Sequence, residues 1–247
     1  MNVLLAGATG TVGSAVLKTL LAGGHRVIAP VRRCSHTAIS SSDSCIPIAW
    51  PEDGLSIASL AGIKIDIVIS CMASRSGSPQ DAQRVEYALN KELLGLATAL
   101  SVKRFVLLSA ICVQRPRLAF QHQKLAFEQA LKLSGLTYTI IRPTAFFKSL
   151  SGQIERVKAG KPYLIFGDGA LTACKPISDR DLADFIVHAL LNEESYLGCF
   201  SDLKEIGEYL IDSFDIEAWL LPYIDYASYA RDTPFGGEHY ATVSSPD

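Results

Sequence analysis

Two features are missing from this 247-residue sequence: long hydrophobic runs and patterned cysteines. No uninterrupted apolar stretch reaches the roughly 18 residues that a membrane span needs. No signal or transit peptide precedes the first apolar run, so we expect a cytoplasmic protein, or an organellar one shown without its leader. The six cysteines are scattered, with no C-x-x-C motif and no nearby His pairing of the kind that a metal site uses. This scatter argues against a zinc site, an iron–sulfur cluster or a disulfide framework.

Charge is divided unevenly along the chain. The net charge is only −2, but residues 1–150 carry 16 Lys and Arg against 8 Asp and Glu, whereas residues 151–247 carry 7 against 17. A basic first part fits a polyanionic ligand such as a dinucleotide. Nucleic acid is the competing ligand, but the sequence has neither a basic cluster nor a recognition motif for it.

Three glycines, each three residues after the last, follow the first apolar run. Residues 3–6 predict a buried parallel strand, and a helical pattern begins beyond Gly13. Gly7 would permit the bend, Gly10 would let phosphates approach the backbone, and Gly13 would let helix and strand pack closely. Backbone amides and a helix N-terminus there would bind a pyrophosphate, and a purely structural turn is the alternative. The residues expected to bind the cofactor here are Gly7, Thr9, Gly10, Thr11, Val12 and Gly13.

Two arginines end the second predicted strand, residues 26–31. The end of this strand meets the adenosine ribose, where an acidic side chain would bind the 2′-hydroxyl of NAD. Arg32 and Arg33 stand there instead, and their guanidinium groups suit a 2′-phosphate, so we predict NADPH. Two solvated arginines are the alternative. Asp53 is expected either to hold the adenine or to cap a helix over residues 54–60.

Strands and helices alternate through the first 150 residues. Further strands are predicted at residues 46–50, 66–71, 104–110 and 136–142, with helices at 81–100 and 120–133. The alternation predicts an α/β fold with a doubly wound parallel sheet of the Rossmann type. We expect residues at or just after the ends of these strands to meet the cofactor, namely Ala73, Ser74, Ser109 and Pro143, and a strand-end polar group is the alternative for Ser109.

The pattern becomes less regular after residue 150. A helix is predicted at residues 153–159, a strand at 163–166 and a helix at 179–191. We therefore predict an NADP-binding domain over residues 1–150 and a smaller substrate-side region over residues 151–247.

Two stretches carry a specific family resemblance: R-P-T-A-F-F-K-S-L at residues 142–150 and A-C-K-P-I-S at residues 173–178. On these the sequence resembles the NADPH-dependent divinyl chlorophyllide or protochlorophyllide 8-vinyl reductases, atypical short-chain dehydrogenases related to isoflavone reductases and NmrA-like proteins. The resemblance covers roughly residues 2–195, and the C-terminal part looks shortened. It implies reduction of the C8 vinyl group of a chlorophyll precursor to ethyl. It also implies a plastid location in a eukaryote or the cytoplasm in a bacterium, and leaves peripheral membrane association open.

The catalytic motif departs from that of ordinary short-chain dehydrogenases. Their Y-x-x-x-K motif supplies an acid and a lysine, but here Phe120 takes the place of the tyrosine before Lys124. This argues against ketone reduction, and it is compatible with reducing a vinyl group conjugated to a macrocycle that delocalises negative charge. We assign Lys124 to ribose positioning, with an electrostatic or proton-relay role; a solvated lysine is the alternative. His122 is expected to be an exposed bystander.

Four residues are candidates to bind the pigment. Flat apolar surface would come from Phe146, Phe147 and Tyr163, and Lys175 would meet a propionate. Core packing is the alternative for the aromatic residues, and solvation for the lysine. Two other functions stay open: a non-catalytic, NmrA-like NADP-sensing or assembly protein, and an isoflavone-reductase-like enzyme acting on a smaller aromatic substrate.

Overall fold

The computed structural model describes residues 1–32, 39–51, 54–60, 62–111, 113–164, 176–191, 196–200 and 239–242. The chain divides into two compact units, Met1–Leu191 and Asn192–Asp247. Two strands in the second unit, β7 (Tyr196–Phe200) and β8 (His239–Thr242), pair in parallel. The candidate site lies in the first unit. Substrate binding confined to residues 151–247 stays a prediction.

The first unit contains a six-stranded parallel sheet in the order β3-β2-β1-β4-β5-β6. Its strands are β1 (Asn2–Ala6), β2 (Arg26–Val31), β3 (Cys45–Ala49), β4 (Ile67–Ser70), β5 (Arg104–Leu108) and β6 (Tyr138–Ile141). The central strands are apolar on both faces, as a sheet covered on both sides requires. The strand order reverses between β1 and β4, and ligands bind outside the carboxyl ends of the strands at such a point. The predicted doubly wound sheet is confirmed.

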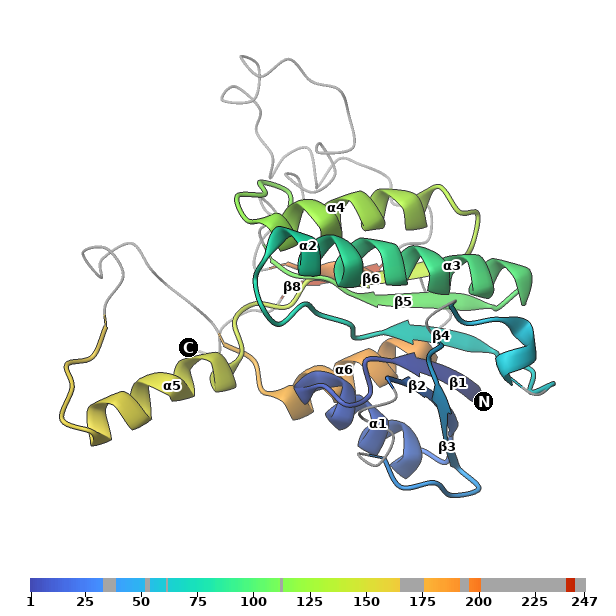
Figure 1. Ribbon diagram of the computed structural model, residues 1–247, viewed down its shortest axis with the longest axis horizontal. Coiled ribbons are helices and arrows are strands. Elements are labelled where there is room, and N and C mark those ends of the chain that lie inside the picture. The colour runs from blue at the N-terminus through green and yellow to red at the C-terminus, as the bar shows by residue number, and fades with distance from the viewer. Residues whose placement is uncertain are drawn as a thin grey trace, which may run out of the picture. The chain divides into compact units, whose positions relative to one another are not determined.

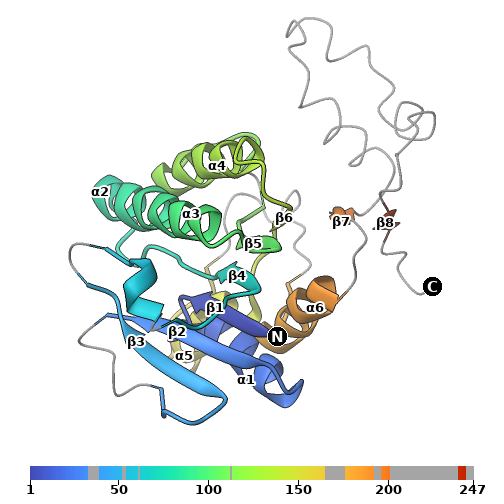
Figure 2. The same ribbon diagram turned by 90° about the vertical axis from the view of Figure 1, so that its right-hand side faces the viewer.

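Helices cover both faces of this sheet (Figures 1 and 2). One face packs against α1 (Thr11–Ala22) and α6 (Asp179–Leu191), and the other against α3 (Leu89–Ala99) and α4 (Ala119–Lys132). The Thr19 hydroxyl donates a 3.0 Å hydrogen bond to Asp184, which joins α1 to α6. The compact unit therefore extends beyond residue 150 and includes α6.

The helix expected at residues 81–100 contains an unexpected wide turn. It begins as α2 (Pro79–Ala82), passes through a π-helical segment, η3 (Gln83–Ala88), and continues as α3. Pro at the first position and the Ser78 hydroxyl, which accepts from Asp81 N, start the helix. A π-turn adds a residue to one helical turn, and such turns are frequent at functional sites.

Three sequence predictions of local structure need correction. The helix expected at residues 153–159 is longer, because α5 (Phe147–Lys158) begins directly after an extended Phe146. No strand forms at Tyr163 and Leu164, because the Gln153 side-chain oxygen accepts from Leu164 N, and the remaining residues of that prediction lie outside the described part. The helix expected at residues 54–60 is only the short 3₁₀ turn η2 (Ile57–Leu60). The strand expected at residues 46–50 does form, as β3. Proline cannot donate a hydrogen bond within a sheet, but Pro47 is tolerated because β3 is an edge strand.

Candidate cofactor and active site

The glycine turn after β1 is built so tightly that two positions exclude any side chain. Gly7 has φ +82°, and a Cβ there would lie 2.7 Å from the Cys71 carbonyl carbon. A Cβ on Gly13 would lie 2.1 Å from Gly7 O, so helix α1 rests on the turn itself. A Cβ on Gly10 would be 3.2 Å from the same oxygen, a much milder crowding. The structure thus requires glycine at Gly7 and Gly13 for packing, and the phosphate role of Gly10 stays a prediction.

The N-terminus of α1 opens onto this turn. Gly10 is the N-cap residue and provides no side chain to cap the helix, while its own N–H closes the turn on Gly7 O at 2.9 Å. First-turn amides and the helix dipole therefore favour an external anion. Thr9, Thr11 and Val12 surround this end, and Val12 is buried. The turn fits the pyrophosphate of a dinucleotide.

A buried ion pair lies at the carboxyl ends of β4 and β5. Lys124 Nζ, on α4, is 2.8 Å from Glu86 Oε2 and donates a 3.1 Å hydrogen bond to Leu108 O at the end of β5. The two charged side chains are 8% and 2% exposed. A solvated lysine, the alternative raised by the sequence, is wrong. His122, two residues earlier, is exposed.

The sequence reasoning missed Glu86, which comes from the π-helical segment η3. Its Oε1 accepts from the Ser74 amide at 2.8 Å and the Ser74 hydroxyl at 2.9 Å, so it ties down the loop after β4. The sequence does contain a signal for Glu86, because Glu86 and Asn90 lie at helical spacing with the apolar Ala82 and Leu93 on one buried face. Two polar residues on such a face are unusual and mark a specific bonding role.

The loop between β4 and α2 is held by a second acid. Asp81 Oδ2 accepts from the backbone amides of Arg75 and Ser76 and from the Ser76 hydroxyl. Those hydrogen bonds, from Ser76 first and then Arg75, lower the pKa of Asp81. Ala73, expected beside the cofactor, lies exposed in this loop.

Two buried groups at the same edge of the sheet are chemically distinctive. Ser109, which follows β5, is buried, and its hydroxyl has no hydrogen-bond partner among the described residues. Cys71, which follows β4, is fully buried, and burial raises the pKa of its thiol to about 12 although the nearby Lys124 charge opposes this. Cys71 is therefore a protonated thiol at neutral pH and no nucleophile.

The other candidate cofactor residues divide between described and undescribed parts of the chain. Arg32 is exposed directly after β2, at the edge where the adenosine ribose is expected. Pro143 is buried after β6, and its carbonyl accepts from Ile111 N at 3.0 Å. Arg33, Asp53 and Lys175 lie outside the described residues. Their roles stay predictions.

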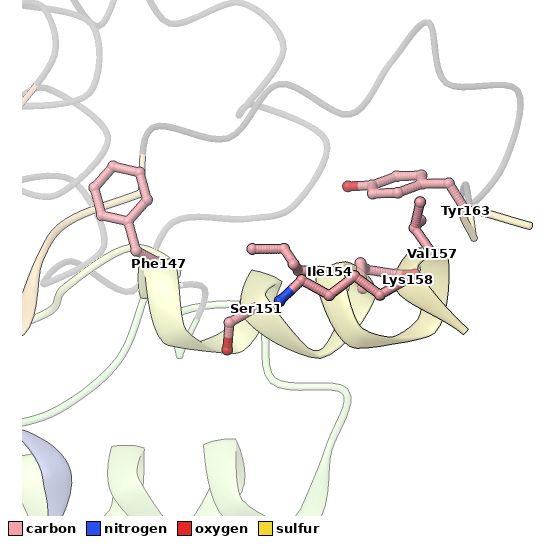
Figure 3. A pocket seen from close by; sticks show the side chains of 7 residues that line it. Phe147, Ser151, Ile154, Val157, Lys158 and Tyr163 are labelled. Carbon is pink, nitrogen blue, oxygen red and sulfur yellow. The ribbon is translucent and has the colours of Figure 1, made fainter. Parts of the chain in front are cut away.

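An apolar groove of about 740 Å³ runs along α5, and it brings together two of the candidate pigment-binding residues. Phe147, Ile154 and Val157 project from the same side of the helix, and the ring of Tyr163, from the segment after α5, lies over that side (Figure 3). Phe147 and Tyr163 are 57% and 59% exposed, which is unusual for large apolar side chains. Phe146 is partly buried against the cluster beneath α1 and α6, as the core-packing alternative expects, and its contact with a pigment stays a prediction.

The described part of the chain holds no group of three His, Cys, Asp or Glu side chains that could bind a metal ion. None of the helices in that part is long and apolar enough to cross a membrane.

The fold and the glycine turn together define a dinucleotide-binding protein of the Rossmann type. Residues 7–193 match the NAD(P)H-binding family, and the chain belongs to that family. Its cofactor is accordingly a nicotinamide dinucleotide. UDP-glucuronic acid 4-epimerase from Bacillus cereus, solved with NAD, superposes with a TM-score of 0.67 at 18% identity, covering 79% of this chain and 74% of the epimerase. At that identity the likeness shows the fold alone.

Among proteins of known name, the chain is 44% identical over 211 residues to the chloroplastic divinyl chlorophyllide a 8-vinyl-reductase of Cucumis sativus. That match covers 78% of this chain and 50% of the reductase. A match to photosystem II assembly factor Ycf39 of Cyanophora paradoxa is 30% identical over 159 residues and covers 62% of this chain and 48% of the factor. The predicted resemblance to the 8-vinyl reductases is confirmed, and the chain spans about half the length of the reductases that it matches.

Proposed function

We propose that this chain is an NADPH-dependent oxidoreductase that reduces the C8 vinyl group of divinyl chlorophyllide or protochlorophyllide to ethyl. The observation that carries the proposal is the 44% identity over 211 residues to an enzyme named for this reaction. The plant relatives are named chloroplastic, which supports a plastid location for this chain if its source is a plant or alga.

NADPH is proposed over NADH because of the residue that follows β2. Arg32 is exposed there, and residues 26–32 contain no acidic side chain that could bind a ribose 2′-hydroxyl. A guanidinium group can donate charge-assisted hydrogen bonds to a 2′-phosphate, each worth about 1.5–3 kcal/mol. Arg33 would add a second guanidinium group.

The proposed chemistry assigns a distinct task to each part of the site. The first-turn amides of α1, beyond the tight turn that Gly7, Gly10 and Gly13 permit, would hold the pyrophosphate, and Lys124 would bind the nicotinamide ribose. When bound, the cofactor would supply a hydride to the vinyl group, whose conjugated macrocycle would take up the negative charge until a proton from water completes the ethyl group. Because Phe120 replaces a tyrosine acid, the chain's contribution is orientation and a fixed positive charge rather than a strong proton donor.

The groove on α5 is the proposed pigment-binding surface. Its apolar lining, with Phe147 at one end and Tyr163 at the other, offers flat contacts for a tetrapyrrole ring. Helix α5 begins four residues after Pro143, so its first turn follows directly from the carboxyl edge where the cofactor is proposed to bind. Lys158, also in the lining, would meet a pigment carboxylate.

A non-catalytic assembly role is the second candidate, and the 30% identity to an assembly factor favours it. The deciding experiment incubates the purified chain with NADPH and a divinyl pigment and follows the Soret band. A blue shift, with consumption of NADPH, is the expected result as vinyl becomes ethyl. NADPH binding without any shift would overturn the reductase proposal in favour of the assembly role.

A further inference from the structure

We propose that Glu86 is the positioning residue for Lys124, and that the π-helical segment η3 exists to place its carboxylate there. The proposal rests on the proposed cofactor role of Lys124 but not on the identity of the pigment. It assigns a function to a buried acid that no sequence motif indicated.

The wide turn is supported on the side that faces the sheet. Asn90 donates from Nδ2 to the carbonyl oxygens of Val85 and Glu86, at 3.0 and 3.1 Å, and so bonds two carbonyls of the π-turn. Its Oδ1 in turn accepts a 2.6 Å hydrogen bond from the Ser70 hydroxyl at the end of β4. Asn90 therefore anchors the irregular turn to the sheet. A buried network that supports one irregular turn this completely fixes the direction of the side chain in that turn.

Glu86 is itself held from two sides. Ser74 binds Oε1 twice, through its amide and its hydroxyl, and Lys124 approaches Oε2. Burying a carboxylate is costly unless it is paired and hydrogen-bonded, and this one is both. The carboxylate thereby connects the loop after β4 with the lysine beside β5.

The cluster also has unused bonding capacity, which suggests a ligand. An ammonium group has three donors, and Leu108 O and Glu86 Oε2 are the acceptors that the described residues give Lys124. Glu86 Oε2 has the Lys124 ammonium at 2.8 Å and no other partner among the described residues, and a carboxylate oxygen has a second lone pair that can accept from a ligand. Ser109, next to Leu108, has an unpartnered buried hydroxyl. A buried hydroxyl without a partner is costly until a ligand bonds it. The hydroxyl groups of a nicotinamide ribose have the donors and acceptors that this cluster needs.

A second buried pair on the same helix provides the matched control. Glu128, one turn after Lys124, receives two hydrogen bonds from Arg142, at 3.2 Å from Nε and 2.5 Å from Nη2. The fork engages both carboxylate oxygens and joins α4 to the end of β6. Glu128→Gln therefore removes a buried charge from α4 without touching the Lys124 contacts.

The test is a double-mutant cycle on NADPH binding, read by the fluorescence of the bound nicotinamide. We expect Glu86→Gln to raise the NADPH Kd by about tenfold, and to change it by less than about twofold when Lys124 is already Met. Glu128→Gln is expected to lower thermal stability and leave the NADPH Kd within about twofold. Equal effects of Glu86→Gln in both backgrounds would overturn the proposal, because a merely structural acid would act independently of the lysine.

Two further variants keep the test decisive. If Glu86→Gln does not fold, Ser74→Ala removes one hydrogen bond to the same carboxylate and is expected to raise the Kd by about threefold, again only when Lys124 is present. Glu86→Asp is expected not to restore binding, because its shorter side chain cannot reach Lys124 and Ser74 together. No pigment is needed. If the effects of Glu86→Gln and the Lys124 change on the NADPH Kd are coupled but the pigment assay shows no Soret shift, the reductase function is rejected and Glu86 remains the positioning residue.

Discussion

The two parts of the candidate site are built in opposite ways. The glycine turn after β1 presents only backbone to its ligand, and its packing forbids a Cβ on Gly7 and Gly13. The Glu86–Lys124 cluster, at the ends of β4 and β5, presents long charged side chains that meet from two separate helices. Both lie at the carboxyl edge of the same parallel sheet.

The difference shows how each part tolerates change. A backbone site fails when any atom is added, whereas a side-chain site fails when one partner is removed or shortened. The glycine turn requires only that neighbouring atoms leave it enough space, and the Cys71 backbone limits that space on one side. The charged cluster needs Ser74, Asn90 and Leu108 to hold its two members in place.

The most severe test of the backbone half is Gly13→Val. A Cβ at this position would lie 2.1 Å from Gly7 O, and backbone cannot yield to it as a flexible side chain could. We expect the free energy of unfolding to fall by more than about 3 kcal/mol, measured by urea denaturation.

Gly10→Ala is the matched control for that change. Its Cβ would lie 3.2 Å from the same oxygen, so we expect a loss below about 1 kcal/mol together with weaker NADPH binding. Equal stability losses for the two variants would show that the turn relaxes, and the contrast between backbone and side-chain sites would no longer hold.

The sequence predicts the backbone half well for a physical reason. A strand, three glycines and a helix lie within a dozen residues, so local pattern is enough to read the turn. The same holds for the parallel sheet, because apolar strands alternating with amphipathic helices leave few other arrangements.

Local pattern could not reveal the charged cluster. Lys124 was expected from its place in a motif, but its burial depends on packing against η3, which is distant in sequence. Helix propensity does not predict the π-turn, because the hydrogen bonds that stabilise it come from Asn90 and Ser70, which lie outside the turn. The start of α5 was missed similarly, because it follows the bridge between Phe146 and Ile177, which are distant in sequence.

Arg32→Ala extends the comparison to the far end of the cofactor. There a side chain, not backbone, is proposed to distinguish two nucleotides. Loss of one guanidinium contact should raise the NADPH Kd by about ten- to a hundredfold and leave the NADH Kd unchanged. Isothermal titration with both cofactors measures this. Arg26→Ala, an exposed arginine at the opposite end of β2, is the control, and parallel losses for NADH and NADPH would refute the assignment.

Phe147→Ser tests whether the α5 groove binds the pigment by apolar contact, unlike the backbone and charged parts of the site. The side chain is 57% exposed, so its removal should leave folding nearly unchanged. Losing its apolar contact is expected to raise the pigment Kd by roughly tenfold, with no effect on the NADPH Kd. Leu133→Ser, an exposed leucine at the end of α4, is the control. If it weakens pigment binding as much, the pigment adheres to apolar surface in general.

Cys71 lies close to both the glycine turn and Lys124 of the charged cluster. Its carbonyl limits the space at Gly7, and its thiol lies close enough to Lys124 for the ammonium charge to oppose the effect of burial. Burial wins, and the pKa of the thiol rises from 9.0 to about 12. The folded chain therefore holds a proton that the unfolded chain releases above about pH 9.

This thiol makes the stability of the chain depend on pH, with a defined sign. A raised pKa contributes stability that is complete below pH 9 and is lost as the pH rises toward 12, because only the unfolded thiol ionises in that window. The loss at pH 10 is about 1.4 kcal/mol. Urea denaturation at pH 8 and pH 10 should show the stability of the native chain falling by about that much more than the stability of Cys71→Ala. If the native chain and Cys71→Ala lose the same stability between pH 8 and pH 10, the folded chain tolerates the thiolate. The attraction of the Lys124 ammonium would then outweigh the effect of burial at Cys71.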